Sequence, residues 1–198
     1  MTYRHRYDTE WLMSQIASGR RLSYLSFWGH TSRGPGVTKA CLSQWWPSNF
    51  TTNGRVYHTA ELWMMDKKAE MFGSNELRAK ILSDSDPRKA KALGRAVKNF
   101  DQRTWDAAKF DLVVRGNYLK FSQNRSLEDF LVRTGEQVLV EASPVDRIWG
   151  VGLSADDPDI LCPSKWRGAN LLGYALMVVR DLLGEEDANL WKIDKTTF

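Results

Sequence analysis

The sequence contains little cysteine and histidine, and this scarcity restricts the kinds of site that it can build. Cys41 and Cys162 are its only cysteines, and His5, His30 and His58 are its only histidines. Two cysteines cannot form a disulfide scaffold, and these five residues show none of the close spacings that are typical of zinc sites. We therefore expect neither a structural metal nor a bound cofactor.

Long hydrophobic runs, internal repeats and linkers are also missing. No stretch approaches the ~20 apolar residues of a membrane helix, and the start at Met1 leads into no apolar signal segment. No Pro-, Gly- or Ser-rich linker divides the chain, and 198 residues suit one well-buried domain. These absences predict a single folded domain without a membrane partner and, by default, a cytoplasmic location. They leave the oligomeric state open.

Positive charge and tryptophan are the two features that the sequence has in excess. The formal net charge is +4, which favours anionic partners such as phosphates, nucleotides or nucleic acid. Nine tryptophans contribute to an aromatic share of 12%. Most of these rings should pack in the core, yet an indole is also a natural stacking surface for a planar base. Composition leaves both interpretations open.

Hydrophobic periodicity and capping residues predict an α+β fold, a single compact domain that is predominantly helical with a few short strands. Strands are expected at 22–28 and 137–141, with an Asn-Gly hairpin over 50–57. Helices are expected at 9–13, 61–72, 75–82, 88–98, 101–121 and 169–183. A capping box of Ser126 and Asp129 predicts one more helix. We interpret residues 1–22 as an N-terminal extension, 23–183 as the domain and 184–198 as a polar tail.

Several segments, taken in order, resemble one protein family. They are Leu42-Ser43-Gln44-Trp45-Trp46-Pro47, the helix from Thr59-Ala60-Glu61 to Ala69, Leu93-Gly94-Arg95, Trp105 with Lys109, Lys120-Phe121, Leu139 to Gly152, and Trp166 to Met177. Over residues 24–183 this series resembles the NADAR superfamily, in particular the YbiA-like proteins. The sequence departs from the family at Gln44, at Leu62 and Trp63, and at Asp66, where Asn, His-Tyr and Gln are usual.

The resemblance implies a YbiA-like fold and N-glycosidase chemistry. YbiA-like proteins are associated with breaking the N-glycosidic bond of early riboflavin-pathway intermediates, and other members with removing ADP-ribose from guanine. We therefore expect hydrolysis of the bond between a phosphorylated ribose, either ribose 5-phosphate or ADP-ribose, and a base-like amine. The partner would be that small molecule or, alternatively, an ADP-ribosylated nucleic acid. A third interpretation is a non-catalytic module that binds NAD or ADP-ribose.

Acidic side chains are the expected catalytic groups. The cleavage passes through an oxocarbenium-like state that a carboxylate stabilises, and the leaving amine needs a proton. Glu61 at a helix start and Asp146 in a glycine-rich loop are the predicted catalytic carboxylates, with Glu141 as a third candidate. Glu61 could instead occupy its position only because an acid is favourable in a first helical turn. Asp146 could merely form a turn, and Glu141 could form an ion pair at the surface. Lys67 is a candidate for a covalent Schiff-base route, against the alternative of a solvated charge.

Tryptophans beside the matching segments are the expected contacts of the leaving base. Trp105 and Trp149 are predicted to sandwich the base, although core packing is an equal alternative for both. Trp45, Trp46 and Trp63 are assigned to packing.

The remaining substrate contacts are assigned by residue type and position. Arg95, Lys98 and Lys109 on two basic helices are predicted to hold the phosphate, unless they form a solvated helix face. Gly150 would let the loop backbone approach the sugar closely. Asn170 would cap the last helix, whose N-terminus would then serve an anion. Gly150 and Gly152 are not a Rossmann fingerprint, because the strand-turn-helix context and the third glycine are missing.

Overall fold

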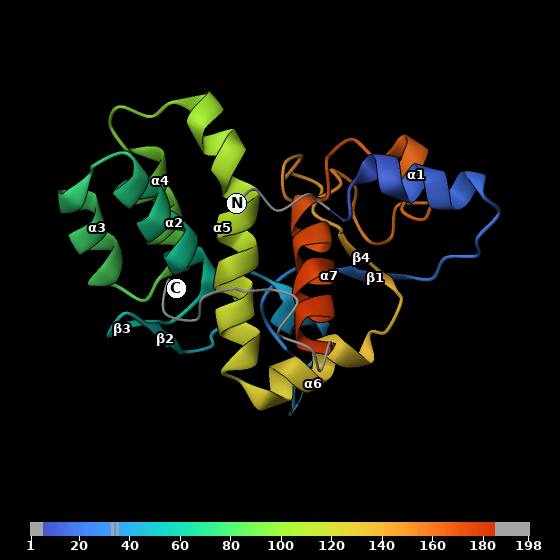
Figure 1. Cartoon of the computed structure of the whole chain (residues 1–198), viewed down its shortest axis with the longest axis horizontal. Coiled ribbons are helices and arrows are strands. Elements are labelled where there is room, and N and C mark those ends of the chain that lie inside the picture. The colour runs from blue at the N-terminus through green and yellow to red at the C-terminus, as the bar shows by residue number, and fades with distance from the viewer. Residues whose placement is uncertain (1–5, 33, 35, 185–198) are drawn as a thin grey trace.

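Seven α-helices are the main elements of the structure, a computed structural model that describes residues 6–32, 34 and 36–184. The helices are α1 (Thr9–Ala17), α2 (Ala60–Met71), α3 (Asn75–Leu82), α4 (Pro87–Arg95), α5 (Gln102–Ser122), α6 (Arg125–Arg133) and α7 (Leu171–Gly184). The strands are β1 (Tyr24–Phe27), β2 (Phe50–Thr52), β3 (Arg55–Tyr57) and β4 (Val138–Glu141), and two 3-10 helices are η1 (Lys39–Leu42) and η2 (Pro163–Lys165). This arrangement confirms the predicted α+β, predominantly helical fold (Figure 1).

Capping side chains determine where three central helices begin. Thr59, Asp86 and Asp101 each accept a hydrogen bond from a backbone N–H in the first turn of α2, α4 and α5. Such caps satisfy N–H groups that have no partner within the helix. Because capping depends on neighbours in the sequence, these starts lie within one residue of the predicted ones.

Other helix ends differ from the predictions. The capping box is wrong, since α6 starts at Arg125 after Asn124, and Ser126 lies within its first turn. The helix expected to reach residue 98 stops at Arg95, where the Ala96 N–H bonds back to the Leu93 carbonyl in a tight last turn. The last helix starts at residue 171 because Asn170 has a φ of 53°, which is incompatible with a right-handed helix.

Two small sheets complete the fold. β2 and β3 form the predicted antiparallel hairpin, and Asn53 and Gly54 take positive φ angles in its turn. β1 and β4 pair in parallel, with Tyr24 opposite Val138 and Phe27 opposite Glu141. Both strands were predicted. Their pairing was not, because it joins parts of the chain that are distant in the sequence.

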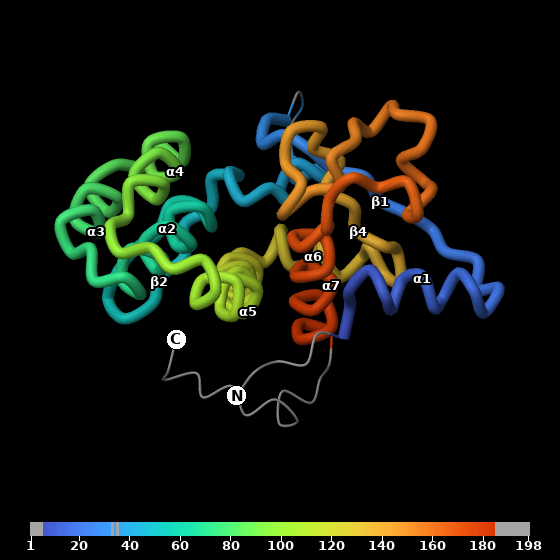
Figure 2. The backbone as a smooth tube through the Cα atoms, turned by 90° about the horizontal axis from the view of Figure 1, so that it is seen from above, coloured from blue at the N-terminus to red at the C-terminus, as the bar shows by residue number. Residues whose placement is uncertain are grey.

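Helices α5 and α7 lie side by side in the middle of the molecule (Figure 2). Helices α2, α3 and α4 pack together on one side of this pair, and β1, β4 and α1 lie on the other. In the expected N-terminal extension, Leu12 is fully buried, and the Tyr7 hydroxyl donates to Asp181 Oδ2 at 2.7 Å. Most of the tail expected at 184–198 lies outside the described residues.

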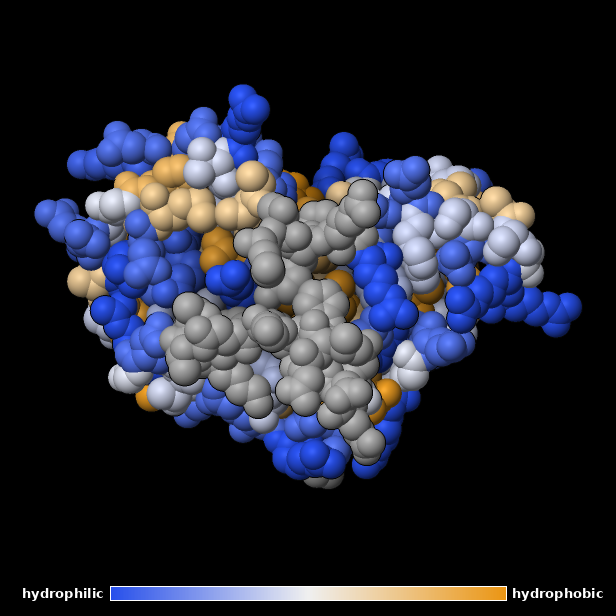
Figure 3. All heavy atoms as spheres, viewed as in Figure 1, coloured by the Kyte–Doolittle hydropathy of each residue, from blue (hydrophilic) through white to orange (hydrophobic). Residues whose placement is uncertain are grey.

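Hydrophilic side chains cover much of the face in Figure 3, and more hydrophobic residues gather at its upper left. None of the described helices combines the length and the apolar character that crossing a membrane would require.

Candidate active site

A cavity of about 930 Å³ lies where the two sides of the molecule meet. Its walls come from helices α2 and α4, from the end of β4 and from three connecting segments, 28–30, 43–45 and 143–149. Trp105 of α5 and Leu172 of α7 complete the lining. Pockets for small ligands commonly measure roughly 300–1,000 Å³, so this cavity is large enough for a nucleotide-sized molecule.

Three carboxyl groups, which we call the carboxyl cluster, line this cavity: Glu61, Glu141 and Asp146. Glu61 stands in the first turn of α2 and is 3% exposed, and Glu141 is the last residue of β4. Glu61 Oε1 and Glu141 Oε2 are buried without a hydrogen-bond partner among the described residues. The structure therefore brings together all three carboxylates that the sequence suggested.

Burial keeps two members of the carboxyl cluster protonated to unusually high pH. It raises the pKa of Glu61 to about 7, with a further contribution from Asp146, against the opposing charge of Lys91 and a hydrogen bond with Trp45. It raises the pKa of Glu141 to about 8, and the charges of Asp146 and Glu61 raise it further. Near neutral pH the cluster therefore offers both a proton donor and a carboxylate, as acid–base chemistry needs.

Asp146 also forms the turn that carries part of the cavity wall. Its Oδ1 accepts hydrogen bonds from the backbone N–H groups of Ile148 at 2.9 Å and Trp149 at 2.8 Å. Its own N–H donates to Ser143 Oγ at 3.2 Å. Asp146 is thus both the turn former that its loop position suggested and a wall residue of the cavity.

Basic residues reach the cavity from both sides, but they are not all the predicted ones. Arg95 lines the cavity as expected, whereas Lys109 forms an ion pair with Asp106 on α5 and is absent from the lining. Lys91 and Arg147 line the cavity and were missed. Lys91 precedes Arg95 by four residues, and this spacing places both side chains on one face of α4. The spacing could therefore have identified Lys91 as a second basic residue of the site.

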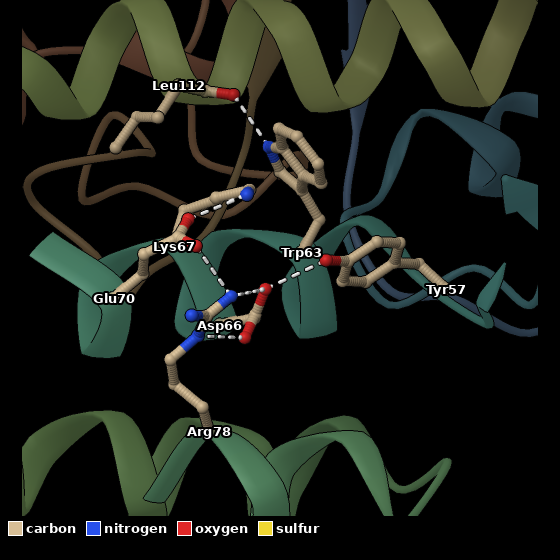
Figure 4. Close-up of polar contacts among 7 residues, drawn as sticks. All are labelled: Tyr57, Trp63, Asp66, Lys67, Glu70, Arg78 and Leu112. Atoms are coloured by element: carbon tan, nitrogen blue, oxygen red, sulfur yellow. Dashed lines mark hydrogen bonds and ion pairs between the residues drawn. The ribbon is translucent and has the colours of Figure 1, made fainter. Parts of the chain in front are cut away.

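Lys67 lies away from the cavity, in a cluster with other charged residues (Figure 4). Its Nζ is 2.7 Å from Glu70 Oε2 and 4.8 Å from the centroid of the Trp63 ring. The neighbouring Lys68 lines the cavity instead, with its Nζ 5.5 Å from the centroid of the Trp105 ring.

Helical periodicity explains this difference. Met64, Met65 and Lys68 follow Glu61 by three, four and seven residues, and all four residues line the cavity. Lys67 belongs to a neighbouring face of α2, so that spacing could have selected Lys68 from the sequence.

Indole rings form much of the remaining wall. Trp105 and Trp149, which are predicted to contact the base, line the cavity, and Trp28 and Trp45 do so as well. Trp45, which was assigned to packing, thus also has a face on the cavity. Trp28, which is 57% exposed, lies at the rim, whereas Trp105 is 8% exposed. The cavity thus has several flat surfaces on which a planar base can stack.

Gly150 and Asn170 support the site without lining it. A Cβ atom on Gly150 would lie 2.9 Å from the Glu141 carbonyl oxygen and 3.0 Å from that of Asp146, so the loop can pack against β4 only with glycine there. Asn170 is fully buried; its Oδ1 accepts from the Glu141 N–H, and its Nδ2 donates to the Leu139 carbonyl. Its side chain therefore binds β4 rather than capping α7 for an anion.

Among the residues that the structure describes, no group of three or more His, Cys, Asp or Glu side chains is placed to hold a metal ion.

Comparison with known proteins identifies the family. The NADAR domain matches residues 26–184. An N-glycosidase of Acanthamoeba polyphaga mimivirus is 45% identical over 163 residues, which cover 80% of this chain and 95% of that protein. The N-glycosidase YbiA of Escherichia coli (strain K12) is 28% identical over 141 residues, which cover 71% of this chain and 78% of YbiA.

Two further matches concern a longer protein and a solved structure. A riboflavin biosynthesis protein of Vibrio vulnificus is 27% identical over 76% of this chain, but the match covers 37% of that longer protein. The NMR structure of Escherichia coli YbiA shares the fold, with a TM-score of 0.67, 23% sequence identity and coverage of 84% of this chain and 88% of YbiA. Because the NADAR domain spans most of the chain and these relatives align along it, the chain belongs to the NADAR family of N-glycosidases.

Proposed function

We propose that the chain hydrolyses the N-glycosidic bond between a phosphorylated ribose, either ribose 5-phosphate or ADP-ribose, and a base-like amine. The observation that carries this proposal is a single cavity in which carboxyl groups, basic side chains and indole rings meet. The substrate has three matching parts: an anomeric carbon that becomes positive, an anionic phosphate and a flat ring. The name of the Vibrio relative, a riboflavin biosynthesis protein, is consistent with such a substrate.

The carboxyl cluster would act at the anomeric carbon. The group with the higher pKa, Glu141, is suited to give a proton to the leaving amine, and its pKa of about 8 keeps it protonated at neutral pH. Glu61, with a pKa of about 7, is partly ionised there and can stabilise the oxocarbenium-like state or activate water. Asp146 supplies a further negative charge close to both.

The basic residues would hold the phosphate, and the indoles the leaving base. Lys91 and Arg95 project from α4 into the cavity, and Arg147 approaches from the loop after β4. Such side chains bind phosphate by charge-assisted hydrogen bonds. Trp105 and Trp149 would stack on the base, a contact that contributes ~1–3 kcal/mol per base.

A parallel assay of two substrates tests the proposed reaction. One substrate is a pyrimidine ribosylamine 5-phosphate, and the other is an oligonucleotide that carries ADP-ribosylated guanine. We expect release of the free amine from the first, because the cavity matches a small ribosyl phosphate in size and charge. Product formation is measured by liquid chromatography.

The other outcomes of this assay point to different functions. Turnover of the oligonucleotide alone, with salt-sensitive DNA binding, would identify a nucleic-acid substrate. Binding of NAD or ADP-ribose without turnover of either substrate would contradict an enzymatic role and support a binding module.

A covalent route through a lysine would use Lys68 rather than Lys67. Burial lowers the pKa of Lys68, and the charge of Arg95 lowers it further, so that more of the amine is neutral and nucleophilic. Its Nζ would add to C1 of the ring-opened imine, the leaving amine would depart with a proton, and water would hydrolyse the resulting Schiff base. This route predicts that borohydride traps a substrate adduct on Lys68.

Lys67 provides the matched control for this test. Mass spectrometry should find the adduct on the wild type and on Lys67→Met, and should find none on Lys68→Met. Full turnover by the wild type without any trapped adduct would contradict the covalent route and leave direct attack by water.

A further inference from the structure

Besides Glu141 Oε2, two buried polar atoms on the cavity wall have no hydrogen-bond partner among the described residues. They are Nε2 of Gln44 and Oε1 of Glu61, and their residues are 8% and 3% exposed. Both residues line the cavity. A buried polar group without a partner costs about 1–3 kcal/mol. Such atoms on a cavity wall therefore mark a place where a ligand group completes the hydrogen bonds.

The backbone holds these two residues next to each other. The Glu61 N–H donates to the Gln44 carbonyl oxygen at 3.0 Å, so both side chains enter the cavity from directly bonded backbone positions. Trp45, the residue after Gln44, forms a hydrogen bond with the Glu61 carboxyl group.

A buried lysine fixes the segment that carries Gln44. Lys120 of α5 is fully buried, and its Nζ donates to the carbonyl oxygens of Cys41 at 2.6 Å and Ser43 at 2.8 Å. The backbone from which the Gln44 side chain extends is thus fixed by α2 and α5. A binding residue on a rigid backbone discriminates between similar ligands better than one on a mobile loop.

A hydroxyl group is the ligand group that suits this pair of atoms. The amide N–H of Gln44 donates, the carboxylate oxygen of Glu61 accepts, and a hydroxyl can accept from the first while donating to the second. If Glu61 stands beside the anomeric carbon, as the proposed function requires, the nearest sugar hydroxyl is the one on C2. Hydrogen bonds to this hydroxyl strengthen in the oxocarbenium-like state of glycoside hydrolysis.

We propose that Gln44, together with Glu61, binds the C2 hydroxyl of the ribosyl group and so makes the enzyme select ribosyl over 2-deoxyribosyl substrates. This inference rests on the proposed function and adds a residue that determines sugar specificity. A site whose buried polar groups are completed by a substrate hydroxyl rejects the analogue without it, because those groups then stay unpaired.

Turnover of matched substrates tests the inference. The wild type should prefer a pyrimidine ribosylamine 5-phosphate over its 2-deoxyribosyl counterpart by about 100-fold in kcat/KM, as expected for hydrogen bonds that involve a charged group. Gln44→Met has a similar shape and no amide, so it should lower kcat/KM for the ribosyl substrate and reduce the preference to below about 10-fold. A purely structural role would lower kcat/KM for both substrates by the same factor.

Gln123 offers a control of the same residue type. Its amide forms hydrogen bonds with the backbone N–H and carbonyl of Thr51, and it is not part of the cavity lining. Gln123→Met should therefore leave the ribosyl preference unchanged.

A binding measurement separates failure of this inference from failure of the proposed function. Calorimetry with ribose 5-phosphate and 2-deoxyribose 5-phosphate should show tighter binding of the first to the wild type, and Gln44→Met should remove the difference. Equal use and equal binding of both sugars by the wild type, or a preference that persists in Gln44→Met, would overturn the role of Gln44. Absence of both binding and turnover for either sugar would overturn the proposed function, and this inference with it.

Discussion

Replacing Glu61 with Gln is expected to lower turnover by about 10²–10⁴-fold, the usual contribution of a general acid or base, and at the same time to stabilise the fold. Gln has the shape of a protonated Glu but cannot become a carboxylate. The variant should therefore keep the cavity and lose the charge that the oxocarbenium-like state needs.

The gain in stability follows from the burial of Glu61. Its pKa rises from 4.5 to about 7 in the folded protein, so the folded state holds the proton more tightly than the unfolded chain. This contribution is complete below pH 4.5 and is lost as the pH rises through 7. Each pKa unit corresponds to about 1.4 kcal/mol, so the wild type loses on the order of 3 kcal/mol between these limits. Glu61→Gln avoids that loss.

Denaturant unfolding at pH 5 and pH 8 measures this effect. The advantage of Glu61→Gln over the wild type should be small at pH 5 and should approach about 3 kcal/mol at pH 8. Glu10→Gln is the control, since Glu10 is exposed in the first turn of α1, and it should change stability by less than ~0.5 kcal/mol. A variant that is inactive and less stable than the wild type at both pH values would show that Glu61 supports the fold rather than the reaction.

Replacing Asp66 with Ala is expected to cost on the order of 3 kcal/mol of stability, because it removes the buried carboxylate that accepts hydrogen bonds from Tyr57 and Arg78 and leaves the buried Tyr57 hydroxyl without its acceptor. Asp66 is fully buried, and Figure 4 shows its carboxylate between Tyr57 and Arg78. Its Oδ1 accepts from Arg78 Nε at 2.9 Å, and its Oδ2 accepts from the Tyr57 hydroxyl at 2.8 Å. These bonds join α2 to α3 and to the β2–β3 hairpin, and α2 is the helix that carries Glu61 and Lys68. The substitution should therefore lower the thermal midpoint by on the order of 10 °C.

An exposed ion pair on α5 serves as the comparison. Asp106 pairs with Lys109 at the surface of α5, so Asp106→Ala should lower stability far less than Asp66→Ala does. Calorimetry of both variants measures the difference. A cost below ~1 kcal/mol for Asp66→Ala would mean that Arg78 and Tyr57 find solvent or new partners, and that this cluster does not hold α2 in place.

The sequence by itself determined the local elements and the chemical types of the site. The capping side chains of Thr59, Asp86 and Asp101 bond N–H groups only two or three residues away. The Asn53-Gly54 turn needs no distant partner. These features could therefore be predicted from the sequence. The resemblance selected Glu61 and Asp146, and the spacing of seven residues from Glu61 contains the information that places Lys68 in the cavity. These signals are short-range, because they depend on backbone geometry and helical period.

The tertiary structure alone decided which of these groups meet and how strongly each holds its proton. Packing of α2 on α5, of α5 on α7 and of α7 on β4 brings Glu141 and Asp146 to Glu61, and no local pattern encodes that approach. Asn170 holds β4 through hydrogen bonds to Leu139 and Glu141, which are distant in the sequence. Gly150 lets the loop pack against the backbone of Glu141 and Asp146. Neither role could be predicted from the local sequence. The raised pKa values of Glu61 and Glu141 arise from burial, which exists only once the whole chain has folded around the cavity.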